Sequence, residues 1–123
     1  MIVSKNKKVI KMNLENDPKE IVLSYIKSLD AFRYDEAGKF LTEKVQIIGP
    51  AGESFANSKE FLNMLQNFKA KYDIKKVFVD DNDVCLLYDM KMQKITAYTA
   101  SCYHLKNNKI TSIRTIFDSK LFD

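Results

Sequence analysis

The 123-residue sequence is poor in several residue types that would narrow its class at once. It holds three glycines, two prolines, two cysteines, one histidine and no tryptophan. Two cysteines do not make a disulfide framework, and one histidine without an H-x-E or C-x-x-C pattern predicts no metal site. No apolar run approaches the roughly 20 residues of a membrane helix, so we expect no membrane partner. Because no secretory leader is evident, we expect a cytoplasmic protein.

Net positive charge is also absent outside one short segment. The whole chain has 20 basic and 16 acidic residues, and residues 1–12 hold four lysines and no acid, which leaves 16 of each sign elsewhere. A nucleic-acid-binding domain would carry its basic excess on the domain itself, so we expect no nucleic-acid partner. We predict a basic leader over 1–12 and a single domain over 13–123. The leader is either a solvated arm or read-through upstream of a natural start at Met12, and both interpretations stay open.

Helix signals occupy the first half of the chain. The segment 17–20, Asp-Pro-Lys-Glu, combines an N-cap, a proline at the first helical position and a capping box. It predicts a helix that ends near residues 32–34. Asp35 would cap a second, shorter helix that reaches Leu41, and Asn57 would cap a third that carries apolar residues at helical spacing.

Strand signals occupy the second half and one segment of the first. A strand over residues 45–48 is followed by a glycine- and proline-containing loop over 49–54. Beyond residue 71 the predicted strands cover 74–79, 84–92, 95–105 and 110–117, with a hairpin turn at Asn107-Asn108. Helices first and strands last indicate an α+β fold with helices on one face of a curved antiparallel sheet.

Four short segments of the second half carry a family resemblance. Cys-Leu-Leu-Tyr-Asp at 85–89, Asn-Asn-Lys-Ile at 107–110, Ile-Arg at 113–114 and Phe-Asp at 117–118 resemble the SnoaL-like branch of the nuclear transport factor 2-like superfamily. The resemblance implies a cone of sheet, with three helices from the N-terminal half packed on its concave face around a pocket. It also implies a homodimer through the sheet face. Where relatives often carry an acidic residue before the hairpin turn, this sequence has Ser101.

The superfamily does not specify one activity. It includes ketosteroid isomerases, polyketide cyclases, epoxide hydrolases and dehydratases, so fold alone leaves the function open. We expect a pocket for a small hydrophobic molecule, with cofactor-free proton transfer as its enzymatic form and no metal. The alternative is a non-catalytic ligand-binding or protein-association module.

Two aspartates are the candidate acid/base residues. Asp89 follows an apolar strand, and a carboxylate on an apolar face would have a raised pKa, which suits a general base. The alternative is an Asp89 that is solvated or paired with a lysine. Asp118 occupies the position that several SnoaL-like cyclases use as acid or base. Strict alternation puts Arg114 and Asp118 on one face of the last strand, about 13 Å apart at ~3.3 Å per residue, and Arg114 could instead meet Asp89 across strands.

Tyrosines are the candidate proton donors. Tyr103 shares a face with Ser101 and is the favoured donor, and Tyr25 lies on the apolar face of the first helix. Alternation groups Leu87 with Asp89, so Leu87 joins Arg114, Ser101 and Tyr25 as a predicted pocket residue.

The histidine and the two cysteines are expected to have other roles. His104 falls on the strand face opposite Tyr103 and is predicted to be a surface or interface residue. Cys85 and Cys102 lie in apolar strands and are predicted to be small buried hydrophobic residues.

Overall fold

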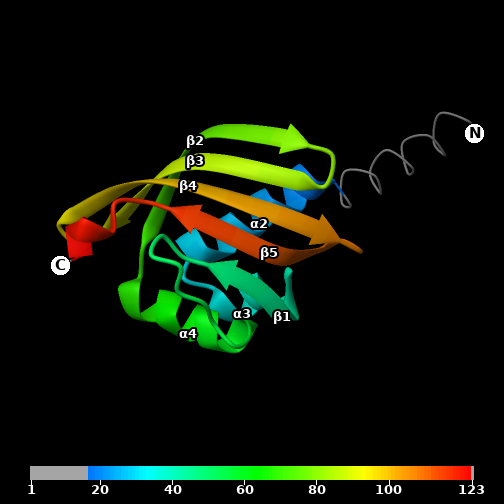
Figure 1. The fold of residues 1–123 in the computed structure, drawn as a ribbon, viewed down its shortest axis with the longest axis horizontal. Helices are drawn as coiled ribbons and strands as arrows, with labels where there is room; N and C mark the ends of the chain where they lie inside the picture. The colour runs from blue at the N-terminus through cyan, green and yellow to red at the C-terminus, as the bar shows by residue number, and fades with distance from the viewer. Residues whose placement is uncertain (1–16, 123) are drawn as a thin grey trace, which may run out of the picture.

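A computed structural model describes residues 17–122, and the predicted basic leader at 1–12 lies outside the described residues. Within them, the three α-helices precede four strands of a five-stranded sheet, and the remaining strand lies between the second and third of these helices, in an α+β fold (Figure 1). The elements are α2 Pro18–Asp30, α3 Tyr34–Gly38, β1 Leu41–Ile48, α4 Ser58–Phe68, β2 Lys71–Asp80, β3 Asp83–Met92, β4 Ile95–Lys106, β5 Lys109–Ile116 and the 3-10 turn η1 Ser119–Phe122. None of the helices in this part of the chain is long and apolar enough to cross a membrane.

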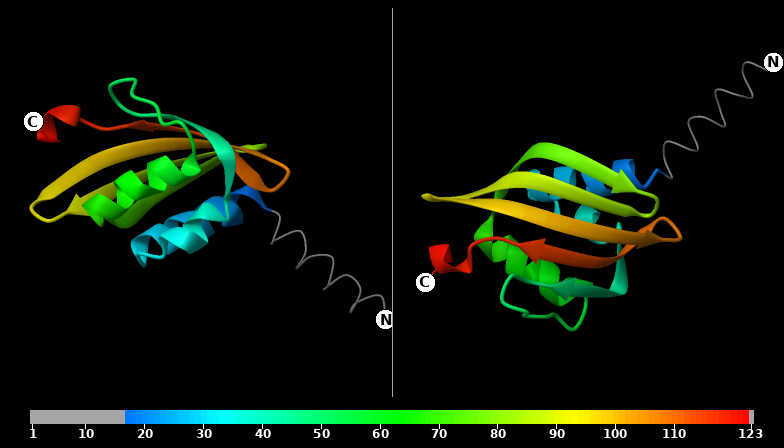
Figure 2. Two further views of the ribbon diagram at one scale, coloured as in Figure 1. Left: turned by 90° about the horizontal axis from the view of Figure 1, so that it is seen from below. Right: turned by 45° about the horizontal axis from the view of Figure 1, so that its top comes forward.

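The sheet is curved, unclosed and covered by helices on its concave face (Figure 2). Its strand order is β1-β5-β4-β3-β2, and strands β2 to β5 form the predicted antiparallel meander. The prediction of a purely antiparallel sheet is wrong at one edge, where β1 and β5 run parallel. No short turn joins these two strands, so their direction is free of the hairpin constraint that makes the other pairs antiparallel.

The predicted caps of the two longer helices are confirmed. The Asp17 carboxylate accepts a hydrogen bond from the backbone N–H of Lys19 at 3.0 Å, and Pro18 is the first residue of α2. The Asn57 side chain accepts one from the backbone N–H of Glu60 at 2.9 Å. These bonds satisfy backbone donors that have no partner within the helix, so both helices begin where the sequence indicates.

The predicted second helix is shorter and starts earlier than expected. It begins at Tyr34 and its N-cap is Arg33, so Asp35 lies in the first turn and is not the cap. It ends at Gly38, and Leu41 begins β1 instead of closing the helix. Glycine is a poor helix residue, and a Cβ at this position would meet the Cδ1 atom of Leu62 at 3.1 Å.

A bulge in β5 changes which of its side chains face the helices. His104 pairs with Ser112 and Leu105 pairs with Ile110, so Thr111 is the extra residue between them. Ile110 is therefore fully buried while Arg114 is exposed, although strict alternation along β5 would put both on one face. The predicted pocket position of Arg114 is wrong because the extra residue reverses the alternation.

A disulfide joins Cys85 of β3 to Cys102 of β4. The two residues are directly opposed in the antiparallel ladder, with their Cα atoms 4.2 Å apart. They lie on the face of the sheet away from the helices, where Cys85 is half-buried and Cys102 is exposed. The prediction of two buried hydrophobic cysteines is wrong, because the strand pairing brings the residues together on the outer face.

Candidate functional site

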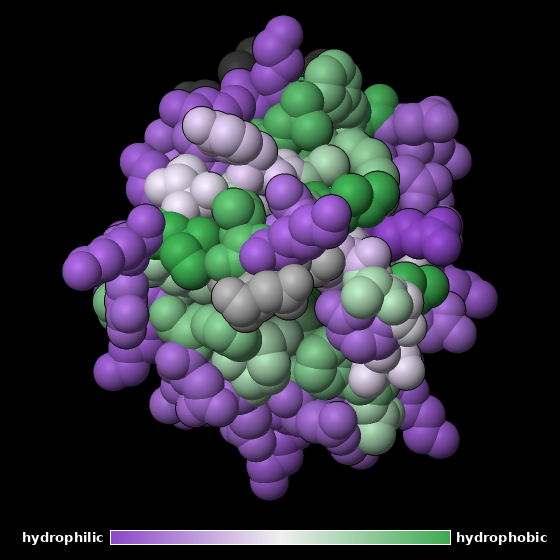
Figure 3. All heavy atoms as spheres, turned by 60° about the vertical axis from the view of Figure 1, so that its left-hand side comes forward, coloured by the Kyte–Doolittle hydropathy of each residue, from purple (hydrophilic) through white to green (hydrophobic). Residues whose placement is uncertain are grey.

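A cavity of about 380 Å³ lies between α2, α4 and the concave face of the sheet. It sits toward the end of the molecule where α4 ends and β2 begins, and Figure 3 shows apolar side chains gathered at that end with hydrophilic residues around them. Its walls are mainly aromatic and aliphatic. The lining residues are Tyr25, Ile26, Leu29, Ile47, Gly49, Pro50, Glu53, Phe55, Phe61, Met64, Leu65, Phe68, Ala70, Tyr72, Tyr88, Met90, Met92, Tyr103, Ile113, Thr115 and Phe117.

Four of the lining residues are tyrosines that come from one helix and three strands. Tyr25 of α2 meets Tyr103 of β4 edge to face, with ring centroids 6.1 Å apart. Tyr72 of β2 and Tyr88 of β3 pack at 5.6 Å. Edge-to-face and tilted contacts of this kind stabilise aromatic clusters beyond simple burial. The rings therefore form a rigid wall that presents hydroxyl groups within an apolar space.

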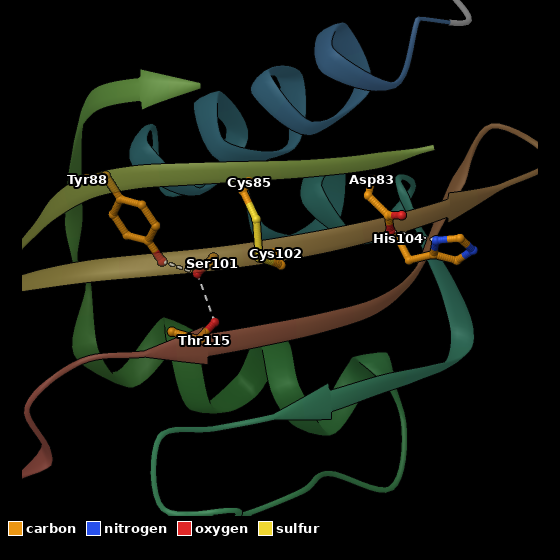
Figure 4. Close-up of a disulfide and its surroundings, with 7 residues drawn as sticks. All are labelled: Asp83, Cys85, Tyr88, Ser101, Cys102, His104 and Thr115. Atoms are coloured by element: carbon orange, nitrogen blue, oxygen red, sulfur yellow. Dashed lines mark hydrogen bonds and ion pairs between the residues drawn. A yellow bond between two sulfur atoms is a disulfide. The ribbon is translucent and has the colours of Figure 1, made fainter. Parts of the chain in front are cut away.

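A row of hydroxyl groups crosses the concave face of three neighbouring strands (Figure 4). The oxygens of Tyr88 and Ser101 are 2.8 Å apart, and those of Ser101 and Thr115 are 2.9 Å apart. Ser101 is almost fully buried, at 1% exposure, while Tyr88 and Thr115 line the cavity. Each hydroxyl can donate or accept, so the row can reorient to suit either an acceptor or a donor on a bound molecule.

Burial keeps the tyrosines protonated. It raises the pKa of Tyr88 to about 12, although hydrogen bonds with Ser101 and Tyr103 act in the opposite direction. Burial also raises the pKa values of Tyr25 and Tyr103 well above their ordinary value, and neighbouring tyrosines add to this effect. Desolvation, with Tyr88 nearby, raises the pKa of Tyr72. At neutral pH these groups are therefore hydrogen-bond donors and not bases.

Among the described residues that line the cavity, Glu53 is the one with a charged side chain. It comes from the loop between β1 and α4, and its carboxylate accepts a hydrogen bond from the backbone N–H of Ala51 at 2.9 Å. The side chain lies against Gly49, where any Cβ would collide with it. Glu53 is exposed, so its side chain meets solvent as well as the cavity wall.

The sequence did not single out Glu53. The signal was its place in the glycine- and proline-containing loop, because loops of this kind often carry functional residues. Spacing within that loop does not show where the side chain points, and only the folded chain places it at the cavity.

Three of the predicted pocket and donor residues lie at or next to the cavity. Tyr25 and Tyr103 line it. Ser101 lies behind its wall, where it bonds to the lining residues Tyr88 and Thr115. The hydroxyl of Ser101 therefore supports the wall of the cavity from behind.

Leu87, Asp89 and Arg114 lie outside the cavity, contrary to the prediction. Leu87 is 41% exposed on the outer face, because the even-numbered residues of β3 are the ones that face the helices. Asp89 shares this outer face, where its carboxylate lies 3.9 Å from the Lys75 ammonium. This matches the alternative of a lysine-paired aspartate. Arg114 is opposite Cys102, and β4 separates its strand from that of Asp89.

Asp118 is also outside the cavity. It follows β5, is exposed, and accepts a hydrogen bond from the backbone N–H of Lys120 at 3.1 Å. This bond satisfies a backbone donor at the start of η1. The predicted placement of both candidate aspartates in the pocket is therefore wrong.

His104 lies on the outer face, as predicted for a surface residue. Its Nδ1 atom is 2.7 Å from the carboxylate of Asp83, and both side chains are about half exposed. Within residues 17–122, no group of three or more histidine, cysteine or acidic residues is arranged to hold a metal ion.

Comparison with known proteins places the chain in a family. No family model and no curated protein matches it. An NTF2-like protein of unknown function from Cytophaga hutchinsonii is 34% identical, with a TM-score of 0.81 over 86% of this chain and 95% of that one.

More distant solved structures share the fold. One, from Kribbella flavida, is provisionally described as a ketosteroid isomerase and is 10% identical, with a TM-score of 0.77 over 83% of this chain and 78% of that one. Another, from Shewanella denitrificans, is provisionally described as a SnoaL-like polyketide cyclase and is 16% identical, with a TM-score of 0.72 over 85% of this chain and 93% of that one. The 34% identical relative, together with the observed fold, shows that the chain belongs to the NTF2-like superfamily.

Proposed function

We propose that the protein binds a small, uncharged and mainly apolar molecule in the cavity between its helices and its sheet. The observation that carries the proposal is a cavity of about 380 Å³ whose walls are almost entirely apolar and aromatic apart from a few hydroxyl groups and Glu53. Cavities of this size, with a small number of placed polar groups, are typical of small-molecule sites.

The polar groups in the wall indicate the chemistry of the ligand. Tyr88 and Thr115 offer hydroxyls that suit a carbonyl or hydroxyl oxygen on the ligand. Within residues 17–122, no lysine, arginine or histidine lines the cavity. A carboxylate or phosphate would lose its hydration without gaining a cationic partner, which is costly in an apolar site. A neutral ligand with one or two oxygens therefore fits better than an anion.

A matched pair of substitutions tests this site. Ala70 lines the cavity and Ala100 lies on the outer face, so Ala70→Leu fills the cavity whereas Ala100→Leu adds the same volume outside it. We expect native mass spectrometry with a panel of neutral aromatic ketones to show binding to the unmodified protein and to A100L, and loss of binding in A70L. Equal binding by both variants would place the ligand elsewhere.

Acid/base catalysis is the second candidate function, and Glu53 is the observation that favours it. It is the one carboxylate in the lining, and buried tyrosines in the same cavity could hydrogen-bond to a developing enolate oxygen. The provisional names of two distant neighbours, a ketosteroid isomerase and a SnoaL-like polyketide cyclase, support this second function.

Isomerisation of a β,γ-unsaturated ketone, followed by the absorbance of the conjugated product, tests this second function. We expect Glu53→Gln to abolish turnover and to leave ketone binding intact, and Asp89→Asn and Asp118→Asn to keep full turnover. If the unmodified protein turned over none of the β,γ-unsaturated ketones that bind to it, the catalytic function would be excluded and only the binding function would remain.

The expected homodimer through the sheet face also stands as a proposal. We infer that a second copy covers the outer face, since that face exposes Phe78 at 53%, Leu87 at 41% and Ile116 at 63%. Neighbouring exposed apolar side chains of this size are typical of protein interfaces. Light scattering at micromolar concentration tests the proposal: we expect twice the mass of one chain, and a monomer would contradict it.

A further inference from the structure

The disulfide on the outer face of the sheet has features of a reactive pair. Cys102 is exposed and Cys85 is half-buried in the single folded chain, so an incoming sulfur atom can reach Cys102 whenever no second copy covers the outer face. Figure 4 shows the bridge between β3 and β4 next to the Asp83–His104 pair. Exposed disulfides are the ones that small thiols exchange with most readily, whereas buried structural bridges resist reduction.

The bridge links strands that are held together without it. Strands β3 and β4 pair continuously from Asp83–His104 to Met92–Ile95, and the cysteines are one pair within this ladder. The fully buried inner residues of both strands add packing against the helices. Breaking the S–S bond therefore leaves the hairpin in place, and exchange does not require unfolding.

The surroundings of Cys102 favour its thiolate. Arg114 lies directly opposite Cys102 on β5, and side chains opposed in this way have Cβ atoms about 5 Å apart. A neighbouring arginine stabilises a thiolate, so in the reduced protein Cys102 is the cysteine that attacks oxidised glutathione more readily. Cys85 is instead opposite Phe78 of β2, an apolar neighbour that gives a thiolate no such stabilisation. For the disulfide, attack by an incoming thiolate is directed to the Cys102 sulfur by its exposure.

We propose that Cys85 and Cys102 form a reversible redox pair, and that Cys102 is a site of modification by low-molecular-weight thiols. A thiolate attacks the sulfur of Cys102, a new S–S bond forms to that sulfur, and Cys85 leaves as a thiolate and takes up a proton. A second thiol then attacks the outer sulfur of the mixed disulfide and releases Cys102. The two thiols lose two electrons as they become a disulfide, and the protein disulfide gains them. Nothing in this exchange depends on the molecule that occupies the cavity.

Modification at Cys102 changes the chemistry of the outer face. The residue lies among the exposed side chains of Leu87, Ile116 and Phe78. A polar adduct such as glutathione would cover part of this apolar area. The oxidised and modified states thus present different surfaces on the same fold.

Exchange in the unmodified protein is the first test. We expect millimolar reduced glutathione to open the disulfide while the circular dichroism spectrum stays native. Intact-mass measurement should show one glutathione adduct, and peptide mapping should place it on Cys102. A disulfide that opens only after the protein unfolds, or an adduct found mainly on Cys85, would overturn the proposal.

Single-cysteine variants give the second test. Cys85→Ser retains the exposed thiol and Cys102→Ser retains the half-buried one, so oxidised glutathione should modify C85S several-fold faster. In the C85S background, Arg114→Gln should slow modification several-fold, whereas Lys94→Gln, a matched loss of charge in the β3–β4 turn, should not. Equal rates in C85S and C102S would contradict the assignment to Cys102.

Discussion

The two faces of the sheet differ in what they surround, although the same strands build both. On β3, Leu86 is fully buried against the helices while its neighbour Leu87 is 41% exposed. On β4, Tyr103 lines the cavity while Tyr98 is 79% exposed on the other side. The concave face holds the cavity and the buried hydroxyls, and the outer face holds the disulfide and most of the ion pairs of the sheet.

This difference shows how a single strand can serve two purposes. Successive side chains point to opposite faces of the sheet. The surroundings of a residue therefore depend on its parity, that is, on whether its position along the strand is even or odd, as much as on its type. A carboxylate on the outer face, such as Asp89, is close to lysines and solvent. A hydroxyl on the inner face, such as that of Ser101, forms its hydrogen bonds with other hydroxyls, those of Tyr88 and Thr115.

Alkaline pH should destabilise the packing of the inner face, and this is the largest loss of stability that we expect. Burial raises the pKa values of Tyr25, Tyr72, Tyr88 and Tyr103 in the folded protein. The unfolded chain gives up these protons near pH 10, so their contribution to stability is complete below about pH 10 and is lost as the pH rises toward the folded pKa, about 12 for Tyr88. We expect cooperative unfolding in this window, with tyrosinate absorbance rising together with the loss of circular dichroism. Ionisation of all six tyrosines in a protein that keeps its native spectrum would contradict this picture.

Neighbouring leucines sharpen the comparison within one strand. Leu86→Ala removes a fully buried side chain and should lower the free energy of unfolding by about 2–5 kcal/mol. Leu87→Ala, the matched control on the outer face, should change it by less than about 0.5 kcal/mol. Urea denaturation measures both values, and similar losses would mean that the outer face is as well packed as the inner one.

The disulfide tests how much the outer face adds to stability. It closes a loop with a sequence separation of 17 residues, which restricts the unfolded chain and contributes about 3 kcal/mol. Cys85→Ser with Cys102→Ser should lower the urea midpoint accordingly and leave the native spectrum unchanged. A double variant that fails to fold would show that the bridge is needed to form the sheet.

A pair of tyrosines gives the smallest expected effect. Tyr88→Phe removes the hydroxyl bonded to Ser101, which keeps Thr115 as a partner, so the loss should be about 1 kcal/mol. Tyr98→Phe on the outer face should be neutral within about 0.5 kcal/mol. Thermal unfolding measures the difference. An equal effect of both changes would mean that the row of hydroxyl groups does not stabilise the fold.

Much of the fold could be predicted from local patterns. The caps at Asp17 and Asn57 and the alternation of β3 and β4 depend on residues close together in the sequence, and the structure confirms them. The bulge at Thr111 and the parallel pairing of β1 with β5 could not be predicted in this way. They depend on contacts between segments far apart in the chain.

The candidate site shows the same division. Tyr25 and Tyr103 were predicted because a core-facing helix position and a strand parity place them there. Glu53 was missed because a loop has no periodicity from which the direction of a side chain follows. Asp89 was misplaced because its apolar neighbours in sequence are not its neighbours in space.

The sequence by itself determined the order of the elements, the caps and the partition of β3 and β4 into two sets of side chains. Only the tertiary structure decided which set faces the cavity, because that choice depends on the side of the sheet against which α2 and α4 pack. The same packing put Cys85 and Cys102 on the outer face, where the β3–β4 register opposes them as a disulfide. Parity is a local property of the backbone, whereas inside and outside are properties of the assembled layers.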